Sequence, residues 1–381
     1  MMKKIIVIPD SFKGTLSSIQ TADIMTAAVR EEMPEAQVVS VPVADGGEGT
    51  VDAFLYALGG ERVEIMVKGP FFDKIPSFYG LLPSGTAVVE MAAAAGLPLV
   101  GKRREVGKTT TYGVGELMRH AVENGAKHII LGLGGSSTND GACGAAAAMG
   151  VKFFNDKDEE FIPVGSTLKD ICRIDSSACA EFLKDVRVTV MCDIENPLCG
   201  PNGAAAVFGP QKGADAAMVR LLDDGLSHLA AVVKRDLGMD VADIPGAGAA
   251  GGMGAGAAAF FGGKLIRGID VVLETVHFTE KLHEADVVFT GEGCFDSQSF
   301  MGKVVSGVAG RAKQMNVPVI VVAGAVKADT DRKKMEEAGI SAAFSINRQA
   351  VPFSEAAPKS ADNLRAVMGN ILKVLKLQGM H

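Results

Sequence analysis

The chain has 381 residues, 48% of them hydrophobic and 22% charged, which is typical of a globular protein and excludes a disordered or fibrous chain. At roughly 150 residues per domain, this length predicts two or three domains. The net charge of −7, the absence of Trp and the lack of a Lys/Arg-rich run argue against a nucleic-acid partner. Glycine is in excess, because 46 of the 381 residues, or about 12%, are glycine against a typical share of about 7%.

Neither a secreted nor a membrane protein is indicated. The apolar run Ile5–Ile8 is shorter than the roughly 7–15 residues of a signal peptide, so we expect a strand here and a cytoplasmic protein. The uncharged stretch Ile244–Gly263 is as long as a membrane span, but it is mostly Gly and Ala and too weakly apolar to insert. The six cysteines include no C-x-x-C pair, so we expect free thiols.

The first part of the chain alternates between strands and helices. Lys4–Pro9 predicts a strand, and the capping-box spacing of Ser17 and Gln20 predicts a helix that starts there. Val38–Val43 predicts a second strand, which is followed by apolar residues at helical spacing. We expect two β-loop-α units in this region.

The middle of the chain is different, because long Gly/Ala segments separate its β-rich stretches. Strands are predicted at residues 63–67, 86–91, 127–133 and 186–192, and one helix precedes the stop at Gly125. A further helix is predicted at Gly141–Met149. We expect this region to form a domain of its own.

The C-terminal part returns to the alternation of the beginning. Strands are predicted at residues 286–290, 317–323 and 341–346, with a helix at 303–314 and a last helix that has a clear apolar face. Alternation at both ends predicts a parallel sheet covered by helices on both faces. We therefore predict an α/β fold in which residues 1–62 plus 285–381 form one domain and residues 63–284 are inserted into it. A split into N- and C-terminal halves is the alternative.

Glycine-rich segments lie where predicted strands meet helices, at residues 10–15, 45–50, 132–140, 193–213 and 291–303. Ligands bind at this edge of open α/β sheets, and N–H groups at helix starts favour phosphate or carboxylate. A single such loop is a weak signal, since turn geometry alone often requires glycine. The acidic residues in these loops would repel one another unless cations neutralise them, so we expect Mg²⁺ and lysine partners: Asp10, Asp45, Glu48, Asp140, Asp193, Glu195, Glu292 and Asp296.

The standard nucleotide-binding motifs are incomplete. Gly101–Thr109 has five rather than four residues between its glycines, so it is not a P-loop. Gly132–Gly135 follows a strand but does not continue as G-x-G-x-x-G. An NAD-dependent oxidoreductase acting on a small hydroxy acid is therefore a weaker hypothesis, and a non-catalytic protein that binds small anions is another alternative.

Several long motifs, in order along the whole chain, resemble those of the bacterial glycerate kinases of the two-domain type. Small departures at Ala142, Cys143 and Cys294–Phe295 affect no expected ligand group. The motifs are Ile8–Gly14, Val43–Thr50, Gly132–Gly141, Asn196–Leu198 with Phe208–Gly213, and Thr290–Gly293 with Asp296, Gly302 and Lys303.

The resemblance implies an ATP-dependent kinase that transfers the γ-phosphoryl group to a hydroxyl of D-glycerate, with 2-phosphoglycerate as the favoured product. It also implies a flavodoxin- or Rossmann-like domain built from both chain ends, an inserted domain with a mixed sheet, and an active site in the cleft between them. We expect ATP and Mg²⁺ as cofactors, glycerate and ATP as small-molecule partners, and no nucleic acid or membrane; a homo-oligomer stays open.

Site residues follow from matching these motifs to roles in phosphoryl transfer. Asp193, directly after a predicted strand, is the expected base, with Lys13 and Asp45 as further catalytic residues. Asp45 and Glu48 can equally cap a helix, and lysines in these loops can be exposed surface residues. We expect glycerate to be bound by Asp10, Ser11, Lys13, Glu48 and Asn196; nucleotide and phosphate by Gly134, Gly135, Ser136, Thr138, Asn139, Gly291, Gly293 and Lys303; and Mg²⁺ by Glu292 and Asp296.

Overall fold

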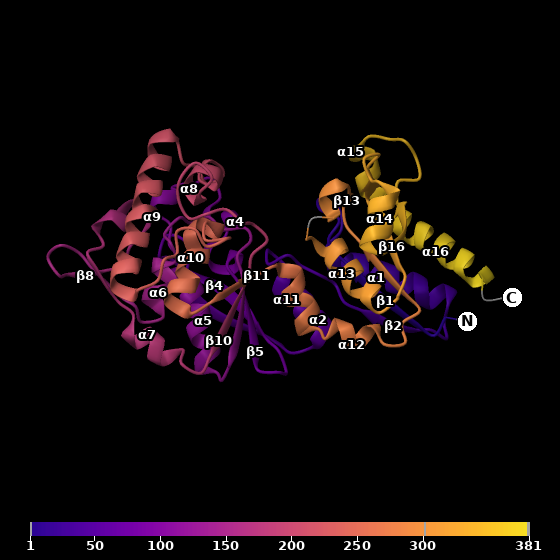
Figure 1. The fold of residues 1–381 in the computed structure, drawn as a ribbon, viewed down its shortest axis with the longest axis horizontal. Coiled ribbons are helices and arrows are strands. Elements are labelled where there is room, and N and C mark those ends of the chain that lie inside the picture. Colours follow the sequence, from indigo (N-terminus) through magenta and orange to yellow (C-terminus); the bar gives the residue numbers. More distant parts are fainter. Residues whose placement is uncertain (1, 301, 379–381) are drawn as a thin grey trace. The chain divides into compact units, whose positions relative to one another are not determined.

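The computed structural model describes residues 2–300 and 302–378 and divides into two compact units (Figure 1). Unit 1 contains the chain up to Ala44, residues Tyr56–Leu58, and the chain from Ile269 onwards; unit 2 contains Asp45–Leu55 and Gly59–Gly268. The predicted ranges, 1–62 plus 285–381 and 63–284, put both junctions between the units later in the chain than the structure does.

Local packing explains where these junctions fall. Strand β3 (Glu61–Lys68) pairs with β4 (Lys74–Leu81) over its whole length, so residues 61–62 belong with unit 2. Helix α11 (Gly268–Thr275) contributes Asp270 to an ion pair with Arg311 of unit 1 at 3.6 Å. Helix α2 (Thr50–Leu58) is divided between the units.

Unit 1 is built on a five-stranded sheet in which all neighbouring strands are parallel. The spatial order β2-β1-β12-β14-β16 corresponds to the flavodoxin-like order 2-1-3-4-5, which confirms the predicted parallel-sheet domain built from both chain ends. The strands are β1 (Lys4–Pro9), β2 (Gln37–Ser40), β12 (Val287–Gly291), β14 (Val319–Ala323) and β16 (Ile340–Ser345).

Helices cover both faces of this sheet, as the alternation of strands and helices predicts. Helices α1 (Ser18–Glu32) and α16 (Ser360–Gln378) pack together and share a core with β1 and β12. Helix α13 (Val304–Gln314) packs against the sheet as well, on β1, β12 and β14. The capping box at the start of α1 is present, with the N–H of Gln20 donating to Oγ of Ser17 at 3.1 Å. The shorter elements are α12 (Phe278–Leu282), α14 (Arg332–Ala338), α15 (Phe353–Ala356), and the small parallel pair β13 (Cys294–Phe295) and β15 (Ala325–Val326).

Unit 2 is built on a six-stranded mixed sheet, as expected for the inserted domain. The order is β11-β10-β6-β5-β4-β3; β3, β4 and β5 pair antiparallel, and the other neighbours pair parallel. A separate antiparallel sheet has the order β8-β7-β9. The remaining strands are β5 (Thr86–Glu90), β6 (His128–Gly132), β7 (Lys152–Phe154), β8 (Glu160–Phe161), β9 (Arg173–Asp175), β10 (Arg187–Met191) and β11 (Lys264–Ile266).

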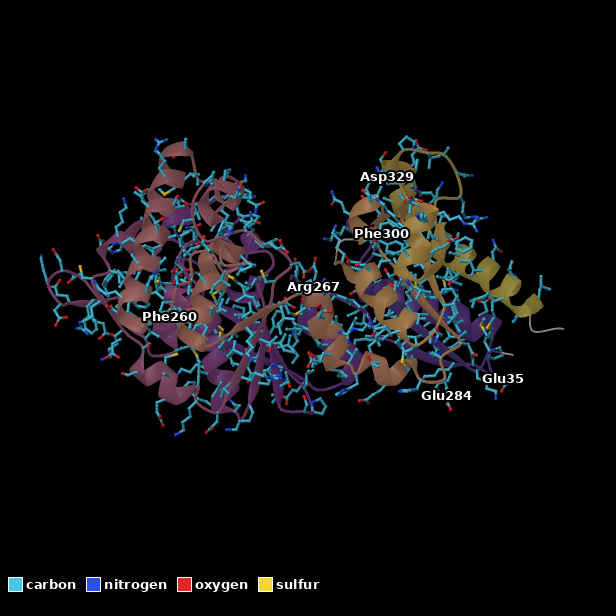
Figure 2. The ribbon with its side chains drawn as sticks, viewed as in Figure 1. Glu35, Phe260, Arg267, Glu284, Phe300 and Asp329 are labelled. Atoms are coloured by element: carbon cyan, nitrogen blue, oxygen red, sulfur yellow. The ribbon has the colours of Figure 1, made fainter. Side chains whose placement is uncertain are left out.

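Helices α5, α6 and α10 pack side by side on this sheet, α5 next to β3–β5 and α10 next to β10 and β11 (Figure 1). Phe260 of α10 lies within the core, where its ring makes a T-shaped contact with Phe153 at 5.7 Å (Figure 2). The helices of unit 2 are α3 (Ala92–Ala95), α4 (Leu97–Val100), α5 (Tyr112–Glu123), α6 (Cys143–Ala148), α7 (Ser177–Phe182), α8 (Ala204–Phe208), α9 (Ala216–Leu237) and α10 (Ala249–Phe261).

Two expectations from composition can be compared with the described residues. All six cysteines are free thiols, three of them at positions of intermediate burial. Within residues 2–300 and 302–378, no helix has the length and apolar character needed to span a membrane, and the Gly/Ala-rich stretch instead contains α10, which is buried in the core.

Candidate active site

The loop after β6, residues 134–136, is fixed by its backbone. The N–H of Gly134 donates to the carbonyl of Gly46 at 2.9 Å. Glycine is needed at this position, since a Cβ on Gly134 would lie 2.5 Å from Cα of Gly47. Gly135 has a φ of +75°, in the left-handed region that favours glycine. Two glycine-rich loops therefore lie back to back in unit 2.

A cavity of about 270 Å³ opens beside these loops, within unit 2. It lies at the carboxyl ends of β6 and β10, the edge where parallel sheets bind ligands. The structure thus brings together five of the predicted site residues: Asp45, Gly134, Gly135, Ser136 and Asp193. The other lining residues are Leu97, Leu133, Met191, Cys192, Ile194, Phe208, Gln211, Lys212, Ala249 and Ala250.

Asp193 follows β10 by two residues, and the backbone of α11 orients its carboxylate. Oδ1 of Asp193 accepts the N–H of Gly268, the first residue of α11, at 2.7 Å. A Cβ on Gly268 would lie 3.2 Å from Oδ2 of Asp193 and 3.4 Å from the carbonyl oxygen of Asp45. Asp193 therefore satisfies a donor at a helix start and also lines the cavity.

Lys212 is a lining residue that the sequence analysis does not select. It ends the 3₁₀ turn Pro210–Lys212 and is only 3% exposed. Its Nζ donates to Oγ of Ser136 and to the carbonyl of Thr138, both at 2.7 Å. Burial lowers the pKa of Lys212 to about 7, although the charge of Asp140 acts in the opposite direction. Its place between Pro210 and Gly213, in the motif Phe208–Gly213 that resembles the glycerate kinases, is the sequence signal that could have identified it.

Thr138 and Asn139 lie beneath the cavity wall and are not among its lining residues. Both are fully buried, and Oγ1 of Thr138 and both side-chain polar atoms of Asn139 have no hydrogen-bond partner among the described residues. Asp140 is also fully buried, which raises its pKa, and its Oδ2 accepts the N–H of Thr111 at 2.7 Å. Asp140 thus ties the loop to the start of α5.

The glycine cluster at residues 246–256, to which the sequence assigns no ligand, packs against the back of this loop. The N–H of Gly141 donates to the carbonyl of Gly251 at 3.0 Å. A Cβ on Gly251 would overlap the carbonyl oxygen of Thr138, and one on Gly256 would overlap the carbonyl oxygen of Gly141. The backbone turns through left-handed conformations at Ala250–Gly252 inside α10. These glycines allow close backbone packing behind the loop.

Two predicted residues of unit 2 do not line the cavity. Glu48 is exposed, in the turn before α2. The Nδ2 of Asn196 donates to the carbonyl of Asn202 at 2.9 Å, a contact within its own loop. Both residues belong to glycine-rich loops whose other members reach the cavity wall.

The other predicted site residues lie in unit 1, at the carboxyl ends of β1 and β12. The N–H of Asp10 donates to the carbonyl of Gly291 at 2.8 Å, and Oδ1 of Asp10 accepts the N–H of Ser11 at 2.6 Å. A Cβ on Gly293 would lie 3.1 Å from the backbone nitrogen of Lys13. The loop after β1 and the loop after β12 therefore lie side by side.

Glu292 is the most perturbed carboxylate of this edge. Its pKa is raised to about 7, mainly by desolvation and also by the charges of Asp10 and Asp296, while Ser299 and Lys303 act in the opposite direction. Its Oε1 is buried and has no hydrogen-bond partner among the described residues. Lys303 is exposed and occupies the N-cap position of α13, where its side chain makes no capping hydrogen bond. The edge thus collects negative charge around a partly desolvated carboxylate.

The described part of the chain contains no group of three or more His, Cys, Asp or Glu side chains arranged to hold a metal ion. Mg²⁺ does not need such a cage, because one or two carboxylates together with water and substrate phosphates usually hold it. Glu292, with its unpartnered buried oxygen, and Asp296, close enough to raise the pKa of Glu292, fit a site of this kind.

Comparisons with known proteins agree over the whole chain. The sequence model described as "Glycerate kinase family" matches residues 5–376. The chain is 43% identical to a glycerate kinase from Bacillus cereus over 376 residues and 44% identical to a glycerate 2-kinase from Escherichia coli over 376 residues, in both cases covering 98% of each chain. The crystal structure of a protein described as glycerate kinase 2 from Salmonella typhimurium LT2 matches with a TM-score of 0.90 and 41% identity, covering 100% of both chains.

Proposed function

Because the chain belongs to the glycerate kinase family, we propose that it transfers the γ-phosphoryl group of ATP to a hydroxyl of D-glycerate. We propose 2-phosphoglycerate as the product, in line with the name of the Escherichia coli relative. The observation that carries this proposal is the cavity of unit 2, in which a carboxylate after a strand end, a glycine-rich loop and a buried lysine meet. Phosphoryl transfer requires mainly such positioning and neutralisation of charge.

We propose Asp193 as the base of the reaction. A bond forms between the glycerate hydroxyl oxygen and the γ-phosphorus while the bond to the bridging oxygen of ADP breaks, and the hydroxyl proton needs an acceptor. Asp193 lines the cavity, and its hydrogen bond to Gly268 at 2.7 Å restricts the orientation of its carboxylate. Asp45 lines the same cavity, and its backbone carbonyl lies against Gly268, which supports a role for Asp45 beside Asp193.

The loop at residues 134–136 is proposed to bind a phosphate group through its backbone. Its conformation is fixed before any ligand binds, because the N–H of Gly134 is bonded to Gly46 and Gly135 has a positive φ. Thr138 and Asn139 would support this loop from beneath rather than touch the ligand, since both are fully buried.

In unit 1, the adjacent loops after β1 and β12 support a second set of roles. We propose that Asp10, Ser11 and Lys13 contribute to binding glycerate. For Glu48 and Asn196, a role in binding glycerate stays a prediction from the sequence. The backbone of Gly291 and Gly293 and the side chain of Lys303 are proposed to bind nucleotide phosphates. The close approach of Gly293 to Lys13 supports a joint role for the two loops.

Glu292 and Asp296 are the residues that would hold Mg²⁺. When bound, Mg²⁺ neutralises the developing charge on the phosphate oxygens. The unpartnered Oε1 of Glu292 and the charge of Asp296, which acts on Glu292, support this assignment. Asp296 also accepts the N–H of Gln298 through Oδ1 at 2.9 Å, which fixes its side chain in the turn after β13.

An ADP-release assay with D-glycerate and Mg²⁺-ATP tests the proposed function. We expect ADP formation that depends on glycerate, and NMR of the product distinguishes phosphorylation of the 2-hydroxyl from that of the 3-hydroxyl. Asp193→Asn purified in parallel controls for a contaminating kinase. ADP formation no faster with glycerate than without it would contradict the proposal.

A further inference from the structure

The cavity of unit 2 has one cationic side chain in its wall, Lys212, beside two carboxylates, Asp45 and Asp193. The ε-amino group of Lys212 is buried, and its two hydrogen bonds run to neutral acceptors, Oγ of Ser136 and the carbonyl oxygen of Thr138. Neither acceptor carries a charge. A buried ammonium that is solvated only by neutral groups is costly, because its desolvation is not offset by a counter-ion.

The chain does not supply the missing counter-ion to Lys212 in the described residues. Asp140 is the one carboxylate that raises its pKa. The Oδ2 of Asp140 is bonded to both the N–H and the hydroxyl of Thr111, at 2.7 and 2.9 Å, and its Oδ1 has no hydrogen-bond partner among the described residues, so Lys212 is not bonded to it. An ammonium has three donors, and two of those of Lys212 are used within the chain. The third has no acceptor among the described residues, and the residue lines the cavity.

We propose that Lys212 is the residue that binds an oxyanion group of a substrate in this cavity, held in position by Ser136 and Thr138. The ligand chemistry is a carboxylate or phosphate oxygen, which glycerate or the nucleotide can supply. This inference rests on the proposed function for the identity of those two ligands. The oxyanion accepts the third hydrogen bond of the ammonium and provides the negative charge that Lys212 lacks within the described residues.

The neighbourhood of Lys212 suits an oxyanion. The lysine is bonded to Ser136, which belongs to the loop whose backbone conformation is fixed at Gly134 and Gly135. A ligand oxygen bound to Lys212 would therefore lie next to the backbone of that loop, and both would act on one group. Thr138 links the same lysine to the buried segment that packs on Gly251, so the amine is positioned from two sides.

Proton linkage gives this role a signature that a purely structural lysine would not have. The pKa of Lys212 in the free protein is about 7, so at pH 8 most of the amine is neutral. An anion at Nζ favours the charged form, and binding then takes up a proton above about pH 7. The affinity for that ligand should fall by up to about tenfold per pH unit above 7.

Calorimetric titration measures this directly. ADP and D-glycerate are titrated separately into the wild type at pH 6, 7 and 8.5, in two buffers with different ionisation heats. We expect one of the two ligands to take up a proton at pH 8.5 beyond its own titration, and the other to show none; this identifies the source of the oxyanion. Inorganic phosphate serves as a third probe, independent of glycerate.

Substitutions separate positioning from bulk stability. Lys212→Met should weaken binding of that ligand by at least about tenfold and abolish its proton uptake. Ser136→Ala should move the pH at which the affinity falls. Lys169→Met, which removes an exposed lysine paired with Asp224, should change neither the affinity nor the proton uptake. Melting temperatures check that each variant is folded; if Lys212→Met is not, Lys212→Gln and the wild-type proton uptake remain as measurements.

The outcomes distinguish this inference from the proposed function. If the wild type turns over glycerate but Lys212→Met binds ADP, glycerate and phosphate as the wild type does, the role of Lys212 is wrong and the kinase proposal stands. If the wild type forms no ADP with glycerate, the proposed function fails, and the phosphate titration still decides the role of Lys212. Absence of proton uptake with every probe overturns it.

Discussion

Unit 1 contains a half-buried carboxyl group, Glu292, and unit 2 contains a buried amine, Lys212, and desolvation is the largest cause that brings both pKa values to about 7. Lys212 is almost fully buried and bonded to two neutral acceptors, whereas Glu292 is half-buried and leaves Oε1 without a donor among the described residues. Other carboxylates crowd Glu292, while Lys212 has a cavity beside it.

The difference indicates what each group binds. A buried amine with no counter-ion favours an anion, and a buried carboxylate among other carboxylates favours a cation. In both cases a ligand of opposite charge shifts the pKa back towards its ordinary value, so binding is coupled to proton uptake at Lys212 and to proton release at Glu292. Variants at these two sites test whether unit 2 binds the anion and unit 1 the cation.

The largest effect is expected for Asp193, the carboxylate that shares the cavity with Lys212. Asp193→Asn should lower kcat by about 10²–10⁴, because the hydroxyl proton loses its acceptor, while the KM for ATP changes little. Steady-state kinetics of ADP release measure both constants. Asp224→Asn, at an exposed ion pair of unit 2, is the matched control and should keep the wild-type kcat. A near-normal kcat for Asp193→Asn would show that Asp193 is not the base.

The next largest effect tests the cation side of the comparison. Glu292→Gln removes a ligand charge, so the Mg²⁺ concentration for half-maximal activity should rise by about tenfold or more. In the wild type, protonation of Glu292 competes with Mg²⁺, so Mg²⁺ affinity should rise as pH increases through about 7 and then level off. A Mg²⁺ titration of the ADP-release rate at several pH values measures this. An unchanged Mg²⁺ requirement in Glu292→Gln would contradict the assignment.

Much of unit 1 can be predicted from the sequence, because its strands are continuous apolar runs and its first helix has a complete capping box. Ser17 begins that helix as expected, and the predicted helix at 303–314 differs only in that Lys303 is its cap. Unit 2 was harder. Helix α9 is not among the predicted elements, although it has an apolar stripe between the Asp215 cap and Gly238, formed by Leu222, Leu226, Leu229 and Val233.

The misses at the site have a physical reason of their own. Asp45 and Asp193 could be selected because each follows a predicted strand within two residues, and ligands bind at the carboxyl ends of such strands. Lys212 follows no strand; it reaches the cavity because the turn after α8 folds its side chain onto Ser136. Its burial depends on contacts distant in sequence, which a local pattern does not contain. The same holds for Gly251, whose neighbours are Thr138 and Asn139.

A smaller effect, on stability, tests how rigidly the anion side is supported. Gly251→Ala should lower the free energy of unfolding by more than about 2 kcal/mol, because its Cβ would overlap the carbonyl of Thr138 and φ is +70°. Gly238→Ala is the matched control: φ is +72°, but no atom lies within 4 Å of the added Cβ, so about 1 kcal/mol of backbone strain is expected alone. Denaturant unfolding compares the two.

Equal losses of unfolding free energy in the two variants would show that glycine is needed at position 251 only for its positive φ, and that the contact with Thr138 contributes nothing. A larger loss at Gly251, together with weaker ligand binding at temperatures where the variant is still folded, would show that α10 supports the conformation of the phosphate-binding loop. Gly238 ends α9 away from the cavity lining, so Gly238→Ala should leave ligand binding unchanged.

A last effect, on the pH dependence of stability, separates a buried carboxylate that has backbone partners from one that lacks them. Glu90, at the end of β5, is 2% exposed, and its Oε1 accepts the N–H of Val51 at 2.7 Å near the start of α2. Burial raises its pKa from 4.5 to about 7, as it does for Glu292. For a raised carboxyl pKa, the folded state binds more protons, so this contribution to stability is present at low pH and is lost as pH rises from about 4.5 to 7.

Glu90→Gln should therefore be less stable than the wild type, or equal to it, near pH 5, and should gain up to about 3 kcal/mol relative to it by pH 8. Glu292→Gln should show the same trend in the absence of Mg²⁺. Adding Mg²⁺ and ADP should reduce the gain for Glu292→Gln only, because a bound cation stabilises the ionised carboxylate of the wild type. Glu90 instead has backbone donors at Gly49 and Val51. Thermal unfolding at each pH, with and without Mg²⁺-ADP, measures the difference; a Mg²⁺ effect of equal size in both variants would mean that Glu292 is buried for structural reasons, like Glu90.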